Sequence, residues 1–505
     1  MRLKVLIGSL DCEVIGPDVE ITGITADSRD INKAAEAGGA LFAAIPGERA
    51  DGHGFIAQAV ENGAACVMAE RPARVSVTQV VVPDARAALS RVASVFYGEP
   101  SRKLVIAGVT GTNGKTTTTY LIESILREAG FNPGVIGTVN YRYGGKTFQA
   151  SHTTPDAPRL HKMLREMLDA GVTHCVMEVS SHSLAQKRVN DCSFDVGVFT
   201  NLTHEHLDYH RTMEEYYRCK SALFRLLRDS GGSSVVNVDD PWGRRLKDEF
   251  PSAAAYGLKE GASITPLGFS FGEGSTEATV RTPAGDVHVS SGLVGEYNLQ
   301  NILAAIGAGC ALGAGPGAIG RGISALARVP GRLEKIEVDG RAKGRFRAYV
   351  DYAHTGDALE RAISALRRIS KGRVITVFGC GGNRDRLKRP VMGSVSARLS
   401  DITIVTSDNP RDEDPLEIIN DIESGMGGVE KRGPGETLGE RCYAVIPERG
   451  EAIRKAVETA RAGDTILIAG KGHEDYQIIK GQKTHFDDFE ALNGAVTELQ
   501  AGPAR

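Results

Sequence analysis

The stretch "GVTGTNGKTTTT" (108–119) decides the fold of the chain around it. It continues the apolar run "LVIAGVT" (104–110), which is typical of a buried strand. It leads into "TTTTYLIESILREAG" (116–130), whose apolar residues recur with helical spacing. A strand, a glycine loop and a helix in this order begin a βαβ unit.

The loop departs by one position from the general phosphate-binding pattern, which would place a glycine where Val109 stands. The parts that bind phosphate are nevertheless present. Glycines let backbone N–H groups approach a phosphate, and the helix N-terminus adds partial positive charge. Lys115 can supply a point charge to the β- and γ-phosphates, and Thr116 a hydroxyl for Mg²⁺. A plain strand-to-helix turn is the alternative; we expect a nucleotide site in which Gly111 is the glycine that matters.

The composition is that of an ordinary globular protein. The 505 residues correspond to about three domains, with 41% apolar and 24% charged residues. A net charge of −3 gives no indication of a nucleic-acid partner, and no apolar run of about 18 residues predicts membrane insertion. The eight cysteines form no C-x-x-C pair, which predicts reduced, mostly buried thiols in a cytoplasmic protein.

The order of strand and helix patterns predicts an α/β fold. A helix is expected over 84–98, and the polar "EPSRK" after it marks a boundary near residue 99. Strands at α/β spacing follow, with an antiparallel insertion over 260–290. "RVPGRLEKI" (328–336) opens a second run of alternating strands and helices, typical of a mostly parallel sheet. The expected domains span 1–98, 99–331 and 332–505.

The cluster "THEHLDYH" (203–210) leaves three interpretations open. It could be a polar surface turn, or part of a Mg²⁺–nucleotide site, since Mg²⁺ needs only one or two protein ligands. The nearby phosphate loop favours the magnesium interpretation. The third interpretation is a zinc metallohydrolase. Its candidate ligands are His204, His206, Asp208 and His210.

Several polar side chains follow predicted strands, where ligands bind in open α/β sheets. Glu178 ends the strand in "VMEVSSH" and is the leading candidate for a Mg²⁺ carboxylate, with a solvated glutamate as the alternative. Arg411 in "SDNPRDEDP" has a fork suited to a carboxylate, or is a solvated turn residue. "GCGGNRDR" (379–386) and "AGKGHEDYQ" (469–477) also follow strands, which predicts a common crevice. Lys220, on a predicted helix over 212–227, is interpreted from the residues alone as a surface lysine.

Taken together, the motifs resemble the Mur ligase family. The family's nucleotide loop T-G-T-N-G-K-T stands here unchanged at 110–116. Other matches, in order along the chain, are "MEVSSH", "TNL…HLDYH", "YNLQN", "GRLE", "DYAHT", "FGCGGNRD", "DNPR" and "GKGHEDYQ". They extend from "ITADSRD" (24–30) to residue 477, nearly the whole chain.

The resemblance implies three domains: one holding the UDP end of the substrate, a central ATPase with a phosphate-loop sheet, and a Rossmann-like C-terminal domain. It implies ATP- and Mg²⁺-dependent amide formation in peptidoglycan synthesis, through an acyl phosphate. The implied substrates are UDP-N-acetylmuramoyl-L-Ala-D-Glu and meso-diaminopimelate. A lysine-adding relative is the alternative, but "DNPR" favours diaminopimelate because lysine has no second carboxylate for Arg411. It implies a cytoplasmic monomer without nucleic-acid or membrane partners. A non-catalytic nucleotide switch is a further alternative class.

The resemblance also implies roles for individual residues. Catalysis would rest on Lys115, Glu178, His206 and Lys220. Mg²⁺ would be held by Thr116, Glu178, His206 and Lys220, the last as a carbamate, which reverses its interpretation as a surface lysine. ATP would contact Gly111, Thr112, Asn113, Gly114, Lys115, Thr116, Thr117, Asn298, Asn301, Arg332 and Asp351. The UDP-muramoyl-dipeptide would contact Ser28, Thr153, Thr154, Ser180, Gln186 and Arg188. Diaminopimelate would contact Arg384, Asp408, Asn409, Pro410, Arg411, Gly470 and Glu474.

Four positions depart from the family pattern. Glu205 stands where Asp is usual before His206, an acid that is one methylene longer. Ser183 and Arg211 each replace a usual Gly, and Gly356 replaces a usual Pro. These departures bear on local loop shape and substrate affinity rather than on the resemblance.

Overall fold

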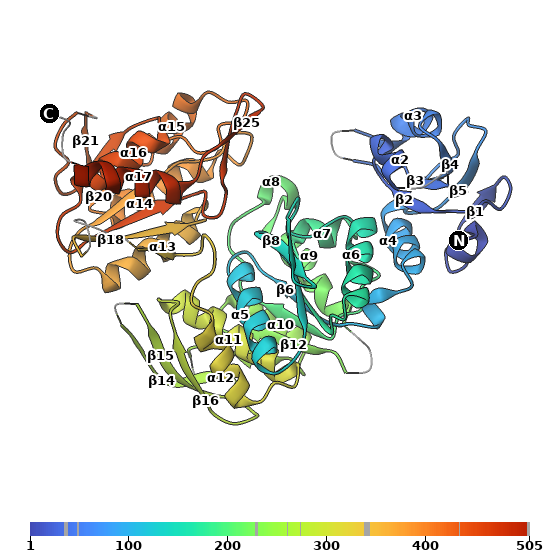
Figure 1. Cartoon of the computed structure of the whole chain (residues 1–505), viewed down its shortest axis with the longest axis horizontal. Coiled ribbons are helices and arrows are strands. Elements are labelled where there is room, and N and C mark those ends of the chain that lie inside the picture. The colour runs from blue at the N-terminus through green and yellow to red at the C-terminus, as the bar shows by residue number, and fades with distance from the viewer. Residues whose placement is uncertain are drawn as a thin grey trace.

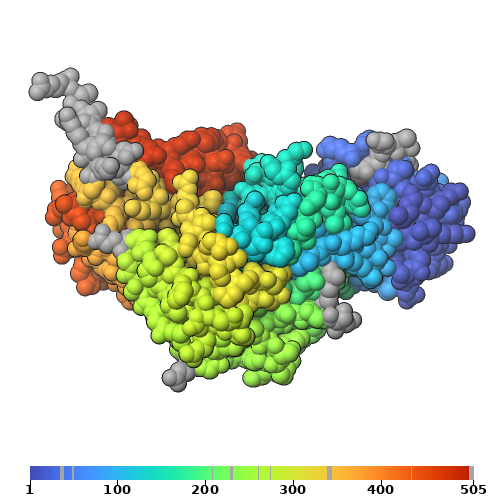
Figure 2. Space-filling view, turned by 60° about the horizontal axis from the view of Figure 1, so that its bottom comes forward, coloured from blue at the N-terminus to red at the C-terminus, as the bar shows by residue number. Residues whose placement is uncertain are grey.

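The computed structural model describes residues 1–34, 39–47, 50–227, 231–259, 261–272, 274–337, 344–433 and 435–501. The chain forms three α/β domains, with the N-terminal domain at one end of the molecule and the C-terminal domain at the other (Figures 1 and 2). Within the described ranges every helix is too short or too polar to span a bilayer.

The N-terminal domain is built on a five-stranded sheet in the order β1-β5-β4-β3-β2, in which only β1 pairs antiparallel. Its strands are β1 (Glu13–Ile15), β2 (Gly23–Thr25), β3 (Ala40–Ala43), β4 (Ala64–Ala69) and β5 (Thr78–Val81). Its helices are α1 (Leu3–Leu6), α2 (Ile31–Ala34), α3 (Ile56–Glu61) and α4 (Ala85–Phe96). Helix α4 confirms the helix predicted over 84–98 and leads towards the central domain (Figure 1).

The central domain has an eight-stranded sheet in the order β13-β12-β11-β6-β10-β7-β8-β9. It is parallel except at β8 and β9. The strands are β6 (Val105–Thr110), β7 (Pro133–Ile136), β8 (Asn140–Tyr143), β9 (Lys146–Gln149), β10 (His174–Glu178), β11 (Val196–Phe199), β12 (Ser233–Asn237) and β13 (Ala254–Tyr256). The helices are α5 (Lys115–Glu128), α6 (Ala157–Asp169), α7 (Ser181–Ala185), α8 (Leu207–His210), α9 (Met213–Arg225), α10 (Pro241–Glu249), α11 (Glu296–Ala311) and α12 (Pro316–Ala325).

Alternation along the buried strands divides the core of this domain into two layers. On β10, Val176 packs with Leu121 of α5 and Leu303 of α11, whereas Met177 packs in the cluster that includes residues of α6 and α9. The central strand β6 lies between β10 and β11, and α5 starts at Lys115 directly after the glycine loop. The predicted strand, loop and helix are therefore confirmed, and the loop lies at the carboxyl edge of the sheet.

The antiparallel insertion predicted over 260–290 is confirmed as a separate three-stranded sheet beside α12 (Figure 1). It consists of β14 (Thr265–Phe271), β15 (Thr276–Arg281) and β16 (Val287–Ser291). All eight cysteines have free thiols, and five of them are buried, as predicted.

The C-terminal domain has a seven-stranded sheet in the order β17-β18-β23-β19-β20-β22-β21, parallel except for β17. The strands, with a separate hairpin of β24 and β25, are β17 (Glu334–Ile336), β18 (Phe346–Asp351), β19 (Val374–Phe378), β20 (Ile402–Val405), β21 (Glu430–Arg432), β22 (Cys442–Val445), β23 (Asp464–Ala469), β24 (Tyr476–Ile479) and β25 (Gln482–His485). The helices are α13 (Gly356–Ile369), α14 (Lys388–Leu399), α15 (Pro415–Glu423), α16 (Arg449–Thr459) and α17 (Asp488–Ala501). The three segments predicted to follow strands in this domain do follow β19, β20 and β23.

Candidate active site

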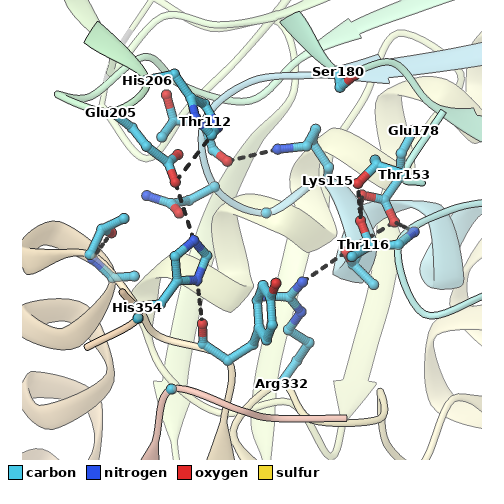
Figure 3. A pocket seen from close by; sticks show the side chains of 18 of the residues that line it. Thr112, Lys115, Thr116, Thr153, Glu178, Ser180, Glu205, His206, Arg332 and His354 are labelled. Carbon is cyan, nitrogen blue, oxygen red and sulfur yellow. Dashed lines mark hydrogen bonds and ion pairs between the residues drawn. The ribbon is translucent and has the colours of Figure 1, made fainter. Parts of the chain in front are cut away.

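The central and C-terminal domains enclose a cavity of about 1150 Å³ (Figure 3). It brings most of the predicted site residues together. Those that line it are Thr112, Asn113, Gly114, Lys115, Thr116, Thr117, Thr153, Thr154, Glu178, Ser180, Arg188, His204, His206, Lys220, Asn301, Arg332, Asp351, Arg384, Asp408, Asn409, Arg411, Gly470 and Glu474.

Among the predicted residues whose side chains the structure describes, six do not line this cavity: Ser28, Gly111, Gln186, His210, Asn298 and Pro410. Ser28 lies in the N-terminal domain, where its hydroxyl donates to Gln58 Oε1 (2.9 Å). Gln186 orients a residue that does line the cavity, because its Oε1 accepts from Arg188 Nη2 (2.6 Å). Asn298 has a similar supporting position, since Asn301 Nδ2 donates to its Oδ1 (3.2 Å).

The phosphate loop is held in shape by its neighbours on the sheet edge. Gly111 and Gly114 have φ of +147° and +87°, a region that L side chains rarely adopt. The Asn201 side chain accepts from Asn113 N (2.9 Å). Lys115 Nζ donates to the carbonyl oxygens of Gly111 (2.9 Å) and Thr112 (2.8 Å). The shifted glycine pattern thus still gives a compact loop with a cation at its mouth.

Glu178 is a buried carboxylate surrounded by hydroxyl and amide donors (Figure 3). Its Oε1 accepts from Thr116 Oγ1 (3.0 Å) and from Thr138 N (2.9 Å), and its Oε2 accepts from Thr138 Oγ1 (2.9 Å). The prediction that Glu178 ends a strand is confirmed, because β10 ends there. A carboxylate next to a hydroxyl at a phosphate loop is a set of hard oxygen donors, which fits Mg²⁺.

Lys220 is 1% exposed, so its interpretation from the residues alone as a surface lysine is wrong. Helix α9 turns it towards the phosphate loop, where Nζ donates to Gly111 O (2.8 Å). Nζ also lies 4.6 Å from the centre of the Tyr216 ring. Burial, reinforced by the charge of Lys115, lowers the pKa of Lys220 well below its ordinary value. A neutral amine is a nucleophile, as formation of a carbamate requires.

The histidines of "THEHLDYH" diverge in their surroundings. Burial lowers the pKa of His206 to about 4, and the nearby His182 and Lys220 add to this, so the ring is neutral at pH 7. His210 stacks on Tyr216 with ring centres 4.9 Å apart, and His204 is exposed. Across the described residues no three His, Cys, Asp or Glu groups gather as a metal cluster. The Asp208 side chain lies outside the described residues. The zinc interpretation therefore finds no support in the geometry.

The strand ends of the C-terminal domain place opposite charges in the same cavity. Asn409 Nδ2 donates to Glu474 Oε2 (2.8 Å), and burial, together with the charge of Asp408, raises the pKa of Glu474. Arg411 adopts φ +53°, and its Nη1 donates to Gly382 O (2.8 Å). The predicted common crevice is confirmed. It can receive a zwitterionic group.

Some residues of the cavity were missed by the sequence reasoning. Thr138 follows β7 and binds Glu178, a position that the rule for strand ends could have flagged. Asp357 accepts from Asn113 Nδ2 (2.7 Å), a contact between domains that no sequence pattern signals. Arg332, which was predicted, makes a further contact between these parts of the chain: its Nη2 donates to Thr116 Oγ1 (3.1 Å) of the phosphate loop.

The departures from the family pattern are accommodated locally. Arg211 keeps a left-handed backbone, with φ +59°, where glycine is usual. Ser183 is buried, and its hydroxyl donates to Ser180 O (2.7 Å). A Cβ at Gly356 would lie 2.8 Å from Val391 Cγ1, so the small residue leaves room for that side chain.

A phosphate loop, a buried carboxylate beside its threonine, and a second α/β domain facing both across one cavity define a nucleotide-dependent enzyme. Three family comparisons identify the class further. The Mur ligase middle domain matches residues 109–309, the Mur ligase glutamate ligase domain matches 331–472, and the Mur ligase family catalytic domain matches 20–97. The chain belongs to the Mur ligase family.

Individual relatives cover the whole chain. The UDP-N-acetylmuramoyl-L-alanyl-D-glutamate–2,6-diaminopimelate ligase of Geobacter metallireducens is 47% identical over 99% of both chains. A solved structure of a ligase with the same name is 31% identical, with a TM-score of 0.66 over 98% of this chain and 99% of that one. The MurF ligase from Thermotoga maritima in complex with ADP is 20% identical, covers 96% and 99%, and has a TM-score of 0.63, which shows the shared fold.

Proposed function

We propose that the chain is the ligase that adds meso-2,6-diaminopimelate to UDP-N-acetylmuramoyl-L-Ala-D-Glu in peptidoglycan synthesis, at the expense of ATP. The relatives at 47% and 31% identity carry that name, and they align with this chain over nearly their full length. The observation that carries the proposal is the single cavity in which the phosphate loop, Glu178 and the charged strand ends of the C-terminal domain meet.

The reaction has two steps. The γ-carboxylate of D-Glu attacks the γ-phosphorus of ATP, the bond to ADP breaks, and an acyl phosphate forms. The amine of diaminopimelate then attacks the acyl carbon, loses a proton and expels phosphate through a tetrahedral intermediate. Phosphoryl transfer depends mainly on positioning and charge neutralisation. Lys115 and the loop N–H groups supply these at the phosphates, and the facing domains keep water from the acyl phosphate.

The residues present fit a magnesium ion. Thr116 and Glu178 offer oxygen ligands, His206 a neutral imidazole, and Lys220 a carboxylate-like oxygen once its amine has taken up CO₂ as a carbamate. When bound, Mg²⁺ neutralises phosphate charge. The three donors around Glu178 keep its side chain aimed at the loop.

The amino-acid substrate is assigned to the C-terminal strand ends. Arg411 offers a guanidinium for the distal carboxylate of diaminopimelate, and Glu474 a carboxylate for its ammonium. Arg384, Asp408, Asn409 and Gly470 line the same part of the cavity, and Pro410 stands between Asn409 and Arg411 in the chain without lining it. A lysine substrate has no distal carboxylate for Arg411 to bind.

The nucleotide-sugar substrate is assigned to the other side of the cavity. Thr153, Thr154, Ser180 and Arg188 would hold the muramoyl-dipeptide, with Gln186 behind Arg188 and Ser28 at the UDP end in the N-terminal domain. We further propose a cytoplasmic monomer, with domain boundaries at 98/99 and 331/332.

One assay tests the proposal. Purified protein receives ATP, Mg²⁺ and UDP-muramoyl-dipeptide, with either diaminopimelate or lysine, and phosphate release is measured. We expect release that depends on diaminopimelate. No amino-acid-dependent release would refute the ligase. Preference for lysine would refute only the role of Arg411 and favour the lysine-adding alternative.

A further inference from the structure

One contact across the domain boundary belongs to a residue that departs from the family pattern. Glu205 lies in the loop between β11 and α8 of the central domain, and His354 lies between β18 and α13 of the C-terminal domain. Their side chains point towards one another across the cavity (Figure 3), with Glu205 Oε1 3.3 Å from His354 Nε2. The same Oε1 is 3.7 Å from His206 Nε2.

The hydrogen bonds of His354 fix the orientation of its ring. Its Nδ1 lies 2.8 Å from the carbonyl oxygen of Tyr352, which can only accept, so Nδ1 donates there. This turns Nε2 towards the Glu205 carboxylate, 3.3 Å away. The contact therefore joins an imidazole of one domain to a carboxylate of the other.

We propose that Glu205 and His354 form a latch that holds the C-terminal domain closed over the phosphate loop, which makes Glu205 a positioning residue. The effect of the latch on catalysis rests on the proposed function. A second hydrogen bond between the domains runs from Asn113 Nδ2 in the phosphate loop to Asp357 Oδ2 (2.7 Å) on α13, the helix that follows His354. The two contacts hold the segment from His354 to Asp357 against the nucleotide site.

The length of Glu205 is what makes the latch possible. An aspartate at this position would withdraw the carboxylate by about 1.5 Å, one C–C bond, and the contact at 3.3 Å would open beyond the range of an ion pair. The environment strengthens the pair, because the Glu205 side chain is only 14% exposed and charges interact more strongly away from water. Glu205→Asp keeps the charge and removes the reach, whereas Glu205→Gln keeps the reach and removes the charge.

The test compares these variants by steady-state phosphate release at varied ATP, with both other substrates saturating. We expect Glu205→Asp and Glu205→Gln each to lower kcat/KM for ATP about tenfold, mainly through KM, because domain closure adds to nucleotide binding. In a His354→Gln background neither change should lower it further, since the two residues act as a unit. Glu214→Gln is the matched control, because Glu214 pairs with Arg245 on the surface, away from the cavity.

A second readout reports closure directly. Small-angle scattering should give a larger radius of gyration for Glu205→Asp than for the wild type, whereas thermal unfolding should match the Glu214→Gln control. The latch is refuted if the Glu205 variants keep kcat/KM within twofold of the wild type, or if their losses multiply with that of His354→Gln. An inactive wild type would instead refute the proposed function, and the scattering comparison would still decide the latch.

Discussion

A steric constraint in the phosphate loop yields a quantitative prediction at Gly114. A Cβ built there would lie 2.3 Å from Asn301 Oδ1, and real Cβ contacts below 3.0 Å essentially never occur. Gly114→Ala therefore requires the loop or the Asn301 side chain to shift by about 0.7 Å, and we expect the loop to move because Asn301 is buried on α11. The φ of +87° adds a backbone cost of about 1–2 kcal/mol for a residue with a side chain.

The opposite end of the same helix offers a matched control. Gly130 follows α5 with φ +85°, and a Cβ there would meet nothing within 4 Å. Gly130→Ala therefore carries the same backbone cost without the steric one. Both variants should lose similar stability through the backbone term, by about 1–2 kcal/mol. Only Gly114→Ala displaces the loop that positions the phosphates, and a displacement approaching 1 Å costs about 100-fold in rate.

Steady-state phosphate release at varied ATP measures the difference, and chemical denaturation of both variants checks the backbone term. We expect kcat/KM of Gly114→Ala to fall about 100-fold below that of Gly130→Ala. Equal kcat/KM in the two variants would refute the reasoning. It would mean that Asn301 moves aside freely and that the loop tolerates a side chain at this glycine.

Three further changes separate function from stability. Lys220→Met should lower turnover at least about 100-fold without lowering the thermal midpoint, because it removes a buried amine; retained turnover would contradict the assigned role. Arg411→Lys should raise KM for diaminopimelate about 100-fold and leave KM for ATP unchanged, since a planar fork is lost; parallel changes would contradict the assignment. Burial, with a contribution from the charge of Arg91, lowers the pKa of His161 to about 3, so only the unfolded chain takes up that proton below pH 6.5. The wild type should therefore lose about 2 kcal/mol more stability than His161→Leu between pH 7 and pH 5 in urea unfolding; equal losses would contradict the buried, neutral ring.

The elements of the fold were largely readable because each carries a local signal. The phosphate loop, helix α4 and the β14–β16 sheet all follow from periodicity and turn residues. The polar strand ends were readable as well, since parallel strands of one sheet present their carboxyl ends at a common edge. What periodicity could not give is the pairing across the domain boundary. Asn113 with Asp357 is a contact over 244 positions, set by how two finished domains dock.

Lys220 shows that a misjudged residue can still have a signal in the sequence. A lysine on a helix is normally solvated, because burying its charge is costly. On α9, however, buried Tyr216 precedes it by four positions and buried Leu223 follows by three, so Lys220 occupies the apolar stripe that faces the core. A cation on such a stripe must be paired, neutralised or modified. Burial lowers the pKa of Lys220, and its contact with Gly111 O places it at the phosphate loop. The helical phase alone could have predicted that Lys220 is buried.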